Sequence, residues 1–512
     1  MPDADRPQAA ESAAPRRADR AEPVKPAPVE PGLLEAEAAP QARTPAPGPE
    51  EPGLLLRTWE SVRTAWRELS GAEAPARARA DLGAREQTDL KRRIAACLTA
   101  RGGEVSARQR AAGLGQIYLD LGREGRKRFL TLLAEEFGPD RAAVNAAVER
   151  YRDASDEAAR RDAQDALRGA LAAPRVRLLT QFNALPQGVK FLVDMRADAL
   201  SFLKEAPELA PVERDLKALL TSWFDIGFLE MQAINWQSPA ALLEKLIEYE
   251  AVHEIRSWDD LHNRLAADRR LYAFFHPNMP MEPLIFVEVA LVKGLAGNVQ
   301  TLLDEDAPTA DPRRQDTAIF YSISNTQTGL RGISLGNFLI KRVVDDLQRD
   351  LPNLKTFSTL SPIPGFRKWM EGLLAEGAPK LLTAEDRKRL KQATGRTVAK
   401  GHLPELLADP GWVDDPALAA ALKEPLMRLC ARYLVREKKR GGPRDPVARF
   451  HLSNGAQVER INWLGDRSQK GLAQSCGMMV NYLYKLSDIE RNHERFAEEG
   501  HIAVSGPVKA LL

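Results

Sequence analysis

The stretch Thr317–Gly365 constrains the fold of this chain more than any other part of it. It begins with a run of β-branched and aromatic residues, Thr317–Ser324, which is typical of a buried strand. The next segment is a loop that contains the glycines Gly329, Gly332 and Gly336. Apolar residues then recur with the period of a helix over Asn337–Arg349, and a second short strand is predicted at Thr356–Leu360. The stretch therefore predicts two strands joined through a glycine loop and a helix.

The glycine loop and the start of the following helix predict a phosphate-binding cradle. The first backbone N–H groups of a helix have no partner within the helix, and the helix dipole is positive at that end, so both attract an anion. The loop is not a P-loop, because Gly336 is followed by Asn337-Phe338 and not by Lys and Ser or Thr. It also lacks the G-x-G-x-x-G spacing of dinucleotide-binding folds.

Length and composition indicate a soluble globular protein with more than one core. The chain has 512 residues, and single hydrophobic cores stop growing near ~250–300 residues. Its net charge of +2 gives no reason to expect a nucleic acid or another polyanion as partner. The 3 cysteines are far apart and odd in number, which argues against a disulfide framework and a zinc site and favours a reducing compartment.

Targeting signals are not evident. No apolar run reaches the ~18 residues of a membrane span, so we expect no membrane partner. The N-terminal segment lacks an apolar signal core and contains many acidic residues, and the final residues Lys509–Leu512 are not the S-K-L peroxisomal address. We therefore expect a cytoplasmic protein.

Three regions follow from the local patterns. Residues 1–52 are rich in proline, alanine and charge and are predicted to be disordered. Residues 53–224 show helical periodicity without strand-like alternation, which predicts an all-helical domain. Residues 225–512 alternate strands with helices, which predicts a mixed α/β domain with helices on both faces of a sheet. The fold class expected for the whole chain is therefore mixed α+β.

Within residues 225–512 the pattern predicts these elements. Strands are expected over Leu271–Phe275, Leu284–Val292, Thr317–Ser324, Thr356–Leu360 and Val447–His451. Helices are expected over Asn337–Arg349, Ala384–Gln392, Pro416–Tyr433 and Leu472–Leu486.

Residue patterns alone do not identify a catalytic group. Ser361 precedes a proline, which holds it extended, and a Ser-Pro pair usually marks a turn. His451 is a lone histidine beside apolar neighbours, which is more often structural than catalytic. The 7 histidines form no H-x-x-x-H pair, so no metal site is predicted.

Many segments in chain order resemble the malonyl-CoA decarboxylase family. They are Phe182–Pro186, Val189–Asp198, Ser222–Phe224, Phe320–Gln327, Leu335–Val344, Leu360–Phe366, Pro425–Cys430, Phe450–Gly455, Ile461–Trp463 and Ser475–Gly477. The similarity runs from about Asp81 to about Leu486 and leaves only the two tails outside. The loop Arg331–Gly336 also resembles the R-x-x-x-x-G pyrophosphate loop of the GNAT acyl-CoA superfamily.

The resemblance implies a GNAT-like catalytic domain that converts malonyl-CoA to acetyl-CoA and CO₂, in malonate and fatty-acid metabolism, without a cofactor. It maps the catalytic serine of the family's L-S-P-I-P-G-F motif onto Ser361 and the catalytic histidine of F-H-L-x-N-G onto His451. In GNAT-like sheets two central strands separate and the acyl chain enters between them, so Ser361 would face the thioester. The helical domain is expected to mediate self-association into a dimer or tetramer.

The resemblance also suggests a substrate-binding set. The loop residues expected to hold the CoA diphosphate are Arg331, Gly332, Ile333, Ser334, Leu335, Gly336 and Asn337. Tyr484 is a candidate partner of the CoA sulfur, although a packed aromatic is an equal alternative. Ser322 is a candidate for the acyl slot, with plain strand packing as the alternative, and Asn454 is a further candidate.

Two other functions stay open at this point. An acyltransferase on the same fold would need a pocket for an acceptor amine and a base to deprotonate it. A non-catalytic acyl-CoA-binding scaffold would be favoured if Ser361 or His451 were replaced, but both are present.

Overall fold

The computed structural model describes residues 54–71, 80–99, 103–224, 226–333, 335, 339–376, 381–396, 402–439 and 441–512. The tail predicted to be disordered, residues 1–52, lies outside these ranges.

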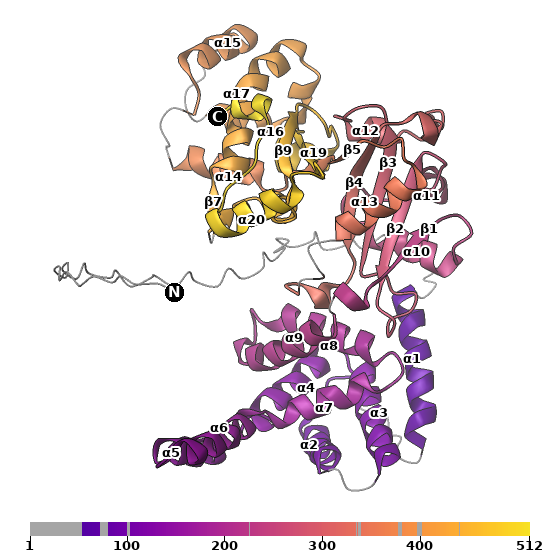
Figure 1. Cartoon of the computed structure of the whole chain (residues 1–512), viewed down its shortest axis with the longest axis vertical. Coiled ribbons are helices and arrows are strands. Elements are labelled where there is room, and N and C mark those ends of the chain that lie inside the picture. The colour runs from indigo at the N-terminus through magenta and orange to yellow at the C-terminus, as the bar shows by residue number, and fades with distance from the viewer. Residues whose placement is uncertain are drawn as a thin grey trace, which may run out of the picture. The chain divides into compact units, whose positions relative to one another are not determined.

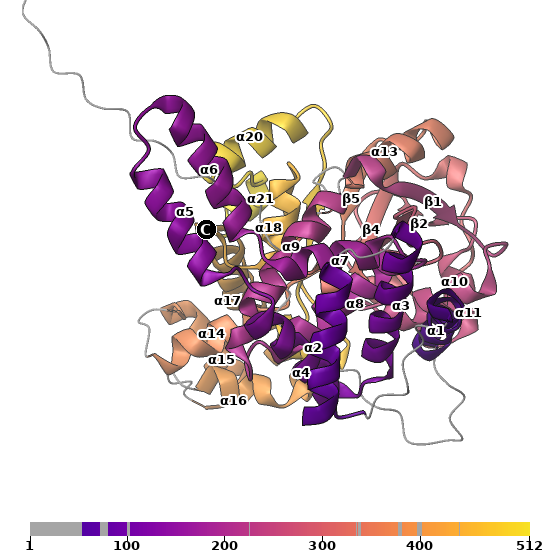
Figure 2. The same ribbon diagram turned by 90° about the horizontal axis from the view of Figure 1, so that it is seen from below.

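The first part of the described chain is all-helical, as the sequence predicts. Its helices are α1 (Leu54–Ser70), α2 (Ala84–Leu98), α3 (Glu104–Asp120), α4 (Arg123–Glu136), α5 (Arg141–Arg152), α6 (Glu157–Leu171), α7 (Pro174–Asn183), α8 (Gly188–Phe202) and α9 (Ala210–Trp223). Aromatic rings fill the core between them. Phe191 of α8 meets Trp66, Tyr118 and Phe182 edge-on, with ring centroids 4.8, 5.5 and 5.1 Å away. Helices α5 and α6 pack against each other as an antiparallel pair (Figures 1 and 2).

The second part is built on a mixed sheet whose strands run in the order β1-β2-β3-β4-β5-β10-β6, with β9 paired to β10. The strands are β1 (Glu230–Ile234), β2 (Arg269–Phe275), β3 (Ile285–Val292), β4 (Thr317–Asn325), β5 (Thr356–Thr359), β6 (Ser361–Pro362), β9 (Gln457–Asn462) and β10 (Met479–Leu483). Pairing is antiparallel except between β4 and β5, which are parallel. A separate short ribbon joins β7 (Lys438–Lys439) to β8 (Gly442–Pro443).

Helices cover both faces of this sheet, which confirms the predicted architecture. Alternate residues of β2 point to opposite sides: Leu271 and Phe275 join the core under α10 (Ala240–Tyr249) and α11 (Trp258–Arg264), whereas Tyr272 and Phe274 join the large core that contains α13 (Leu339–Asp350). The amphipathic stripe predicted for α13 is correct, since Leu339, Val343 and Leu347 are buried.

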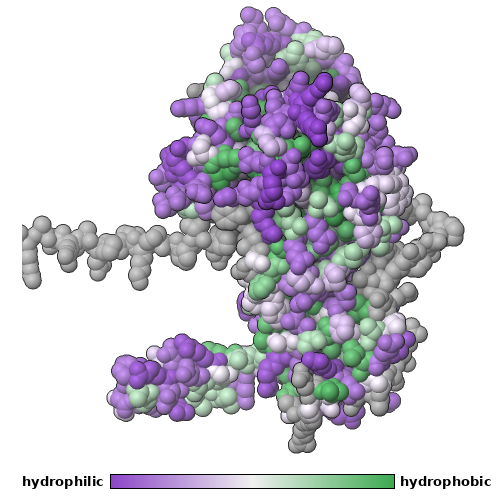
Figure 3. Space-filling view, turned by 45° about the vertical axis from the view of Figure 1, so that its right-hand side comes forward, coloured by the Kyte–Doolittle hydropathy of each residue, from purple (hydrophilic) through white to green (hydrophobic). Residues whose placement is uncertain are grey.

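The remaining helices are α12 (Val299–Leu302), α14 (Phe366–Ala375), α15 (Ala384–Thr394), α16 (His402–Ala408), α17 (Pro416–Val435), α18 (Pro446–Ser453), α19 (Gln469–Ser475), α20 (Ile489–Glu499) and α21 (Gly506–Lys509). None of the helices in the described ranges is both long enough and apolar enough to cross a membrane. Hydrophilic residues dominate the face shown in Figure 3, and hydrophobic residues form small separate patches on it. The cysteines Cys97, Cys430 and Cys476 are free and buried.

The parallel strands β4 and β5 separate after four paired positions. Their last pair is Phe320 with Thr359, and the N–H of Leu360 still donates to the Phe320 carbonyl at 2.9 Å. The register between β3 and β4 also shifts there, because Ser322 pairs with Glu288 and Phe320 with Val289. Tyr321 is thus the extra residue of a β-bulge, a feature that bends a strand. Beyond this point β4 no longer pairs with β5, as the resemblance to GNAT-like sheets implies.

Two predicted elements are wrong. Val447–His451 was expected to be a strand but lies within helix α18. Asp445 caps this helix by accepting from the Ala448 N–H at 2.8 Å, and Pro446 occupies the first turn, where it needs no N–H partner. These local helix-start signals outweigh the strand propensity of Val447 and Phe450.

The helix predicted over Leu472–Leu486 ends at Ser475 and is followed by strand β10. The backbone turns at Cys476 and Gly477, whose φ angles of 53° and 75° are left-handed and incompatible with a continuing helix. The chain then runs as the strand that pairs with β5, β6 and β9.

Candidate active site

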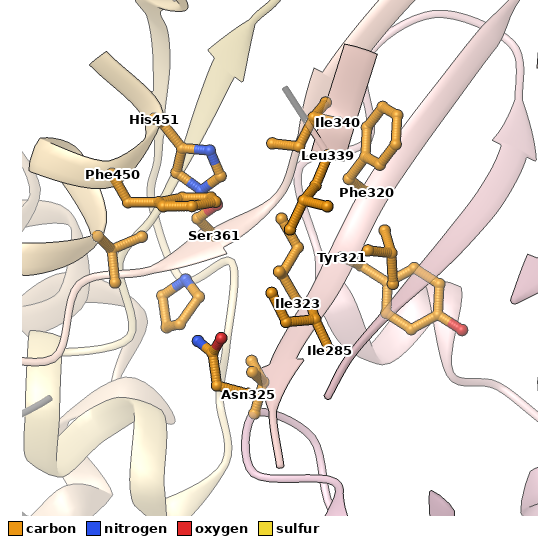
Figure 4. Close-up of a pocket in the computed structure, with 14 residues that line it drawn as sticks. Ile285, Phe320, Tyr321, Ile323, Asn325, Leu339, Ile340, Ser361, Phe450 and His451 are labelled. Atoms are coloured by element: carbon orange, nitrogen blue, oxygen red, sulfur yellow. The ribbon is translucent and has the colours of Figure 1, made fainter. Parts of the chain in front are cut away.

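A cavity of about 110 Å³ lies where β4 and β5 separate. Aliphatic and aromatic side chains form most of its wall, and Asn325, Ser361 and His451 contribute polar groups. Figure 4 shows His451 and Ser361 on one side of the cavity, facing Leu339 and Ile340 on the other side. A small polar group set in an otherwise apolar wall is the usual composition of a ligand site.

Ser361 lies where β4 and β5 separate, because the single residue Leu360 lies between the end of β5 and the start of β6. Leu360 ends the contact with β4, and Ser361 then resumes the strand line as the first residue of β6, paired with Val480 of β10. Ser361 is 5% exposed and lines the cavity. The sheet itself therefore fixes the position of this hydroxyl.

His451 reaches the same point from helix α18, where it occupies the last turn. It is 3% exposed, and the ring of Tyr482 stacks on the imidazole with centroids 4.6 Å apart and planes 24° apart. Burial disfavours the charged imidazolium and lowers the pKa of His451 to about 3. The ring is therefore neutral near pH 7 and has one N–H donor and one bare nitrogen.

Hydrogen bonds join these groups in a line. Nδ1 of His451 lies 2.7 Å from the Tyr484 hydroxyl, and Nε2 lies 3.2 Å from Oγ of Ser361. Ser361 donates in turn to Oγ1 of Thr359 at 2.8 Å. The side chains Tyr484, His451, Ser361 and Thr359 are all buried, and burial also raises the pKa of Tyr484 well above its ordinary value. This set is called the hydroxyl–imidazole line below.

The hydroxyl–imidazole line can move or donate a proton beside the cavity. A neutral imidazole held between two hydroxyl groups can accept a proton on one nitrogen while it gives up a proton from the other. Among the described residues, no group of three or more His, Cys, Asp or Glu side chains is placed to hold a metal ion.

The structure places Tyr484 inside the hydroxyl–imidazole line, through its contact with His451. Ser322, by contrast, was expected as a candidate for the acyl slot and lies elsewhere. Its hydroxyl donates to the Glu250 carboxylate at 2.8 and 2.9 Å, and it is not part of the cavity wall. On this part of β4 the residues Ile323 and Asn325 line the cavity, whereas Figure 4 shows the ring of Tyr321 directed away from Ser361 and His451. Strand alternation therefore turns Ser322 to the side opposite Ile323.

Asn454 has a structural position in this fold. Its backbone N–H and its side-chain amide both donate to the Phe450 carbonyl, the amide at 2.7 Å, and thus close the C-terminal end of α18. It does not line the cavity. The expected contact of Asn454 with substrate stays a prediction, and its hydrogen bonds hold the helix turn that contains His451.

The loop expected to bind the CoA diphosphate is only partly described. Ser334, Gly336 and Asn337 lie outside the described residues. Arg331 is exposed, Gly332 has a left-handed φ of 77° that favours glycine, and the side chains of Ile333 and Leu335 are buried in the large core.

Helix α8 of the helical region holds the start of this loop. Arg196, which is 2% exposed, donates to the Gly329 carbonyl and also bonds to Glu213. A Cβ added at Gly329 would lie 1.7 Å from the Val193 carbonyl oxygen, so only glycine fits. The sequence similarity at Val189–Asp198 includes Arg196 and Val193, but their contact with the loop is visible only in three dimensions.

Sequence reasoning missed two residues of the site. Thr359 contacts Ser361 and also accepts from the Tyr482 N–H at 3.1 Å, and Tyr482 stacks on His451. A period-two rule applied to the strand would have placed Thr359 on the same side as Ser361. Tyr482 was missed because a helix was predicted over Leu472–Leu486. A strand there would have placed Tyr482 and Tyr484 on the same side.

Comparisons with known proteins agree with this fold. Residues 137–224 match the family model described as the malonyl-CoA decarboxylase N-terminal domain, and residues 227–512 match the C-terminal domain. The mitochondrial malonyl-CoA decarboxylase of Anser anser anser is 42% identical over 79% of this chain and 84% of its own length. That of Rattus norvegicus is 43% identical over 76% of this chain and 82% of its own length.

Solved structures lead to the same family. The malonyl-CoA decarboxylase from Rhodopseudomonas palustris is 44% identical and superposes with a TM-score of 0.76, covering 83% of this chain and 99% of that one. The enzyme from Agrobacterium vitis gives 44% identity and a TM-score of 0.75 over 83% of this chain and 99% of that one. The chain therefore belongs to the malonyl-CoA decarboxylase family.

Proposed function

We propose that this protein decarboxylates malonyl-CoA to acetyl-CoA and CO₂. The observation that supports this most directly is the hydroxyl–imidazole line at the edge of a mainly apolar cavity between separating strands. Membership in the malonyl-CoA decarboxylase family gives the substrate. The activity is that of a carboxy-lyase.

The reaction breaks the bond between the α-carbon and the carboxylate carbon. The electron pair of that bond passes into the thioester as an enolate, CO₂ leaves, and the α-carbon then takes up one proton. An apolar wall disfavours the charged carboxylate more than neutral CO₂, so the lining of the cavity favours this step. The thioester itself delocalises the electron pair, so the proposed reaction requires no cofactor.

The two catalytic residues have different roles in this scheme. Ser361 engages the malonyl carboxylate through its hydroxyl and relays a proton, and His451 donates the proton that quenches the enolate. Tyr484 supports His451 through its contact with Nδ1. The loop from Arg331 to Asn337 holds the CoA diphosphate at the start of α13, where a helix N-terminus favours an anion.

The proposal extends to the organisation of the chain. We treat residues 53–224 as a helical domain that mediates self-association into a dimer or tetramer, and residues 225–512 as the catalytic domain. The relatives from Anser anser anser and Rattus norvegicus are named as mitochondrial proteins, so the cytoplasmic location expected from the sequence stays a prediction.

An assay without any acceptor tests the proposed function. Purified protein is incubated with malonyl-CoA labelled in the free carboxylate, and acetyl-CoA and labelled CO₂ are measured together. We expect them to appear in equal amounts and malonyl-CoA to disappear at the same rate. Product formation only after an amine is added would identify an acyltransferase and contradict the proposal. Binding of malonyl-CoA without turnover would instead favour the scaffold.

A further inference from the structure

The contact with Thr359 decides which groups donate and which accept hydrogen bonds along the hydroxyl–imidazole line. In the contact between the two hydroxyl groups, Ser361 is the donor and Thr359 is the acceptor. Oγ1 of Thr359 also accepts from the backbone N–H of Tyr482, so both of its lone pairs face donors. A serine hydroxyl has only one proton, and Ser361 donates this proton in its hydrogen bond to Thr359. Ser361 can therefore offer His451 only a lone pair.

This direction decides which nitrogen of His451 carries the proton. Nε2 faces the Ser361 oxygen at 3.2 Å, and because that oxygen accepts, Nε2 must be the donor. A neutral imidazole has a single N–H, so Nδ1 is bare and accepts from the Tyr484 hydroxyl at 2.7 Å. The opposite tautomer would leave Nε2 without a proton on the side of the cavity.

We propose that Thr359 is a positioning residue that keeps the His451 proton on Nε2, the nitrogen beside the cavity, and so prepares the ring to act as an acid. This inference rests on the proposed function and deepens it. Both ends of the hydroxyl–imidazole line are held by β10 and the residue that follows it, since Tyr482 of β10 donates its backbone N–H to Thr359 and Tyr484, directly after the strand, contributes its hydroxyl.

Each proton that moves in the proposed step has a source and a destination. When the substrate carboxylate binds, Ser361 donates to it in place of Thr359, while Tyr484 continues to donate to Nδ1. After CO₂ leaves, the Nε2–H bond breaks and a C–H bond forms at the α-carbon. The Tyr484 proton moves to Nδ1, so the ring stays neutral. The phenolate left on Tyr484 then takes up one proton from solvent, which is the one proton that the overall reaction consumes. Because a thioester enolate is a stronger base than a phenolate, the transfer to the α-carbon is downhill.

Nuclear magnetic resonance of ¹⁵N-labelled histidine reads the tautomer directly, in the substrate-free protein. The signals of His451 are assigned by their loss in His451→Asn. We expect a protonated Nε2 and a bare Nδ1 in the parent protein. Thr359→Val, which has a similar shape but no hydroxyl, should shift the population toward the Nδ1–H form, and Thr359→Ser should restore the parent pattern. A parent protein with its proton on Nδ1 would overturn the inference.

Kinetics provide the second measurement. Thr359→Val should lower kcat by about 10²-fold, the lower end of what general acid catalysis contributes, with KM changed little. Thr359→Ser should recover most of this loss. If Thr359→Val keeps the parent tautomer and the parent kcat, Thr359 only packs and the inference is wrong. If the valine variant does not fold, the tautomer of the parent and of Thr359→Ser still decides.

The tautomer measurement needs no turnover, so it separates the two proposals. A parent protein that shows Nε2–H but does not decarboxylate malonyl-CoA would refute the proposed function and leave the geometry intact. A parent protein that decarboxylates malonyl-CoA with its resting proton on Nδ1 would refute the role of Thr359 alone.

Discussion

Burial of neutral His451 should make the protein less stable in mild acid, and replacing this histidine should remove part of that effect. The pKa of His451 is about 3 in the folded protein because of burial, against 6.5 for an ordinary histidine. Below pH 6.5 His451 therefore binds a proton in the unfolded chain but not in the folded chain. The free energy of unfolding falls as the pH decreases from 6.5, and this loss stops growing near pH 3.

The magnitude follows from the gap between the two pKa values. Each pH unit in this window removes about 1.4 kcal/mol, so the contribution of His451 between pH 6.5 and pH 5 is about 2 kcal/mol. At pH 5 the folded ring is still neutral, because its pKa lies about two units lower. The expected loss at pH 5 therefore depends on the unfolded pKa and hardly on the folded one.

The assay is urea denaturation of the parent and of His451→Asn at pH 7.5 and pH 5. Asparagine has no titration in this range, so the difference in unfolding free energy between the two pH values should be about 2 kcal/mol smaller in the variant. His501→Asn serves as the matched control, because His501 is an exposed histidine outside the site. An equal loss in the parent and in His451→Asn would show that His451 titrates alike in both states, and the reasoning would fail.

Three further predictions follow from single contacts and from the tail. Glu250→Ala should lower the melting temperature, with a loss of about 1–3 kcal/mol for each buried donor left unpaired, because the carboxylate accepts from the hydroxyls of Ser322 and Ser324; an unchanged melting curve would refute this. Gly329→Ala should raise KM for malonyl-CoA by displacing the loop, whereas Gly372→Ala, with open space around its Cβ, should not; calorimetric CoA binding equal to that of the parent would contradict a role of the loop. Deletion of residues 1–52 should leave the melting temperature and kcat unchanged, and loss of a cooperative melting transition would show that the tail docks on the folded part.

The element pattern of the chain could be predicted where one signal dominated. Long helices with period 3.6 and the strand Thr317–Ser324 were correct, because burial of an apolar face decides such elements. The errors at Val447–His451 and Leu472–Leu486 occurred where short capping signals compete with apolar runs. Asp445-Pro446 starts a helix, and the left-handed turn at Cys476 stops one, although both segments are rich in strand-forming or helix-forming residues.

The site could not be assembled from local patterns. Ser361 and His451 are separated by 90 positions, and only the tertiary fold brings Oγ within 3.2 Å of Nε2. Their assignment depended on the family resemblance. Strand alternation puts Ser322 and Ser324 on one side of β4, but the bulge at Tyr321 and the buried carboxylate of Glu250 decide which side that is.

The central claim is that Ser361 and His451 act as one proton-transfer unit on malonyl-CoA, and a double-mutant cycle on kcat tests it most directly. General acid catalysis contributes about 10²–10⁴ in rate, so Ser361→Ala and His451→Asn should each lower kcat by that order, with CoA affinity changed far less. If the pair is a unit, the double variant should be scarcely slower than the more damaged single variant. Full kcat per folded molecule in His451→Asn, or losses that multiply in the double variant, would contradict the claim.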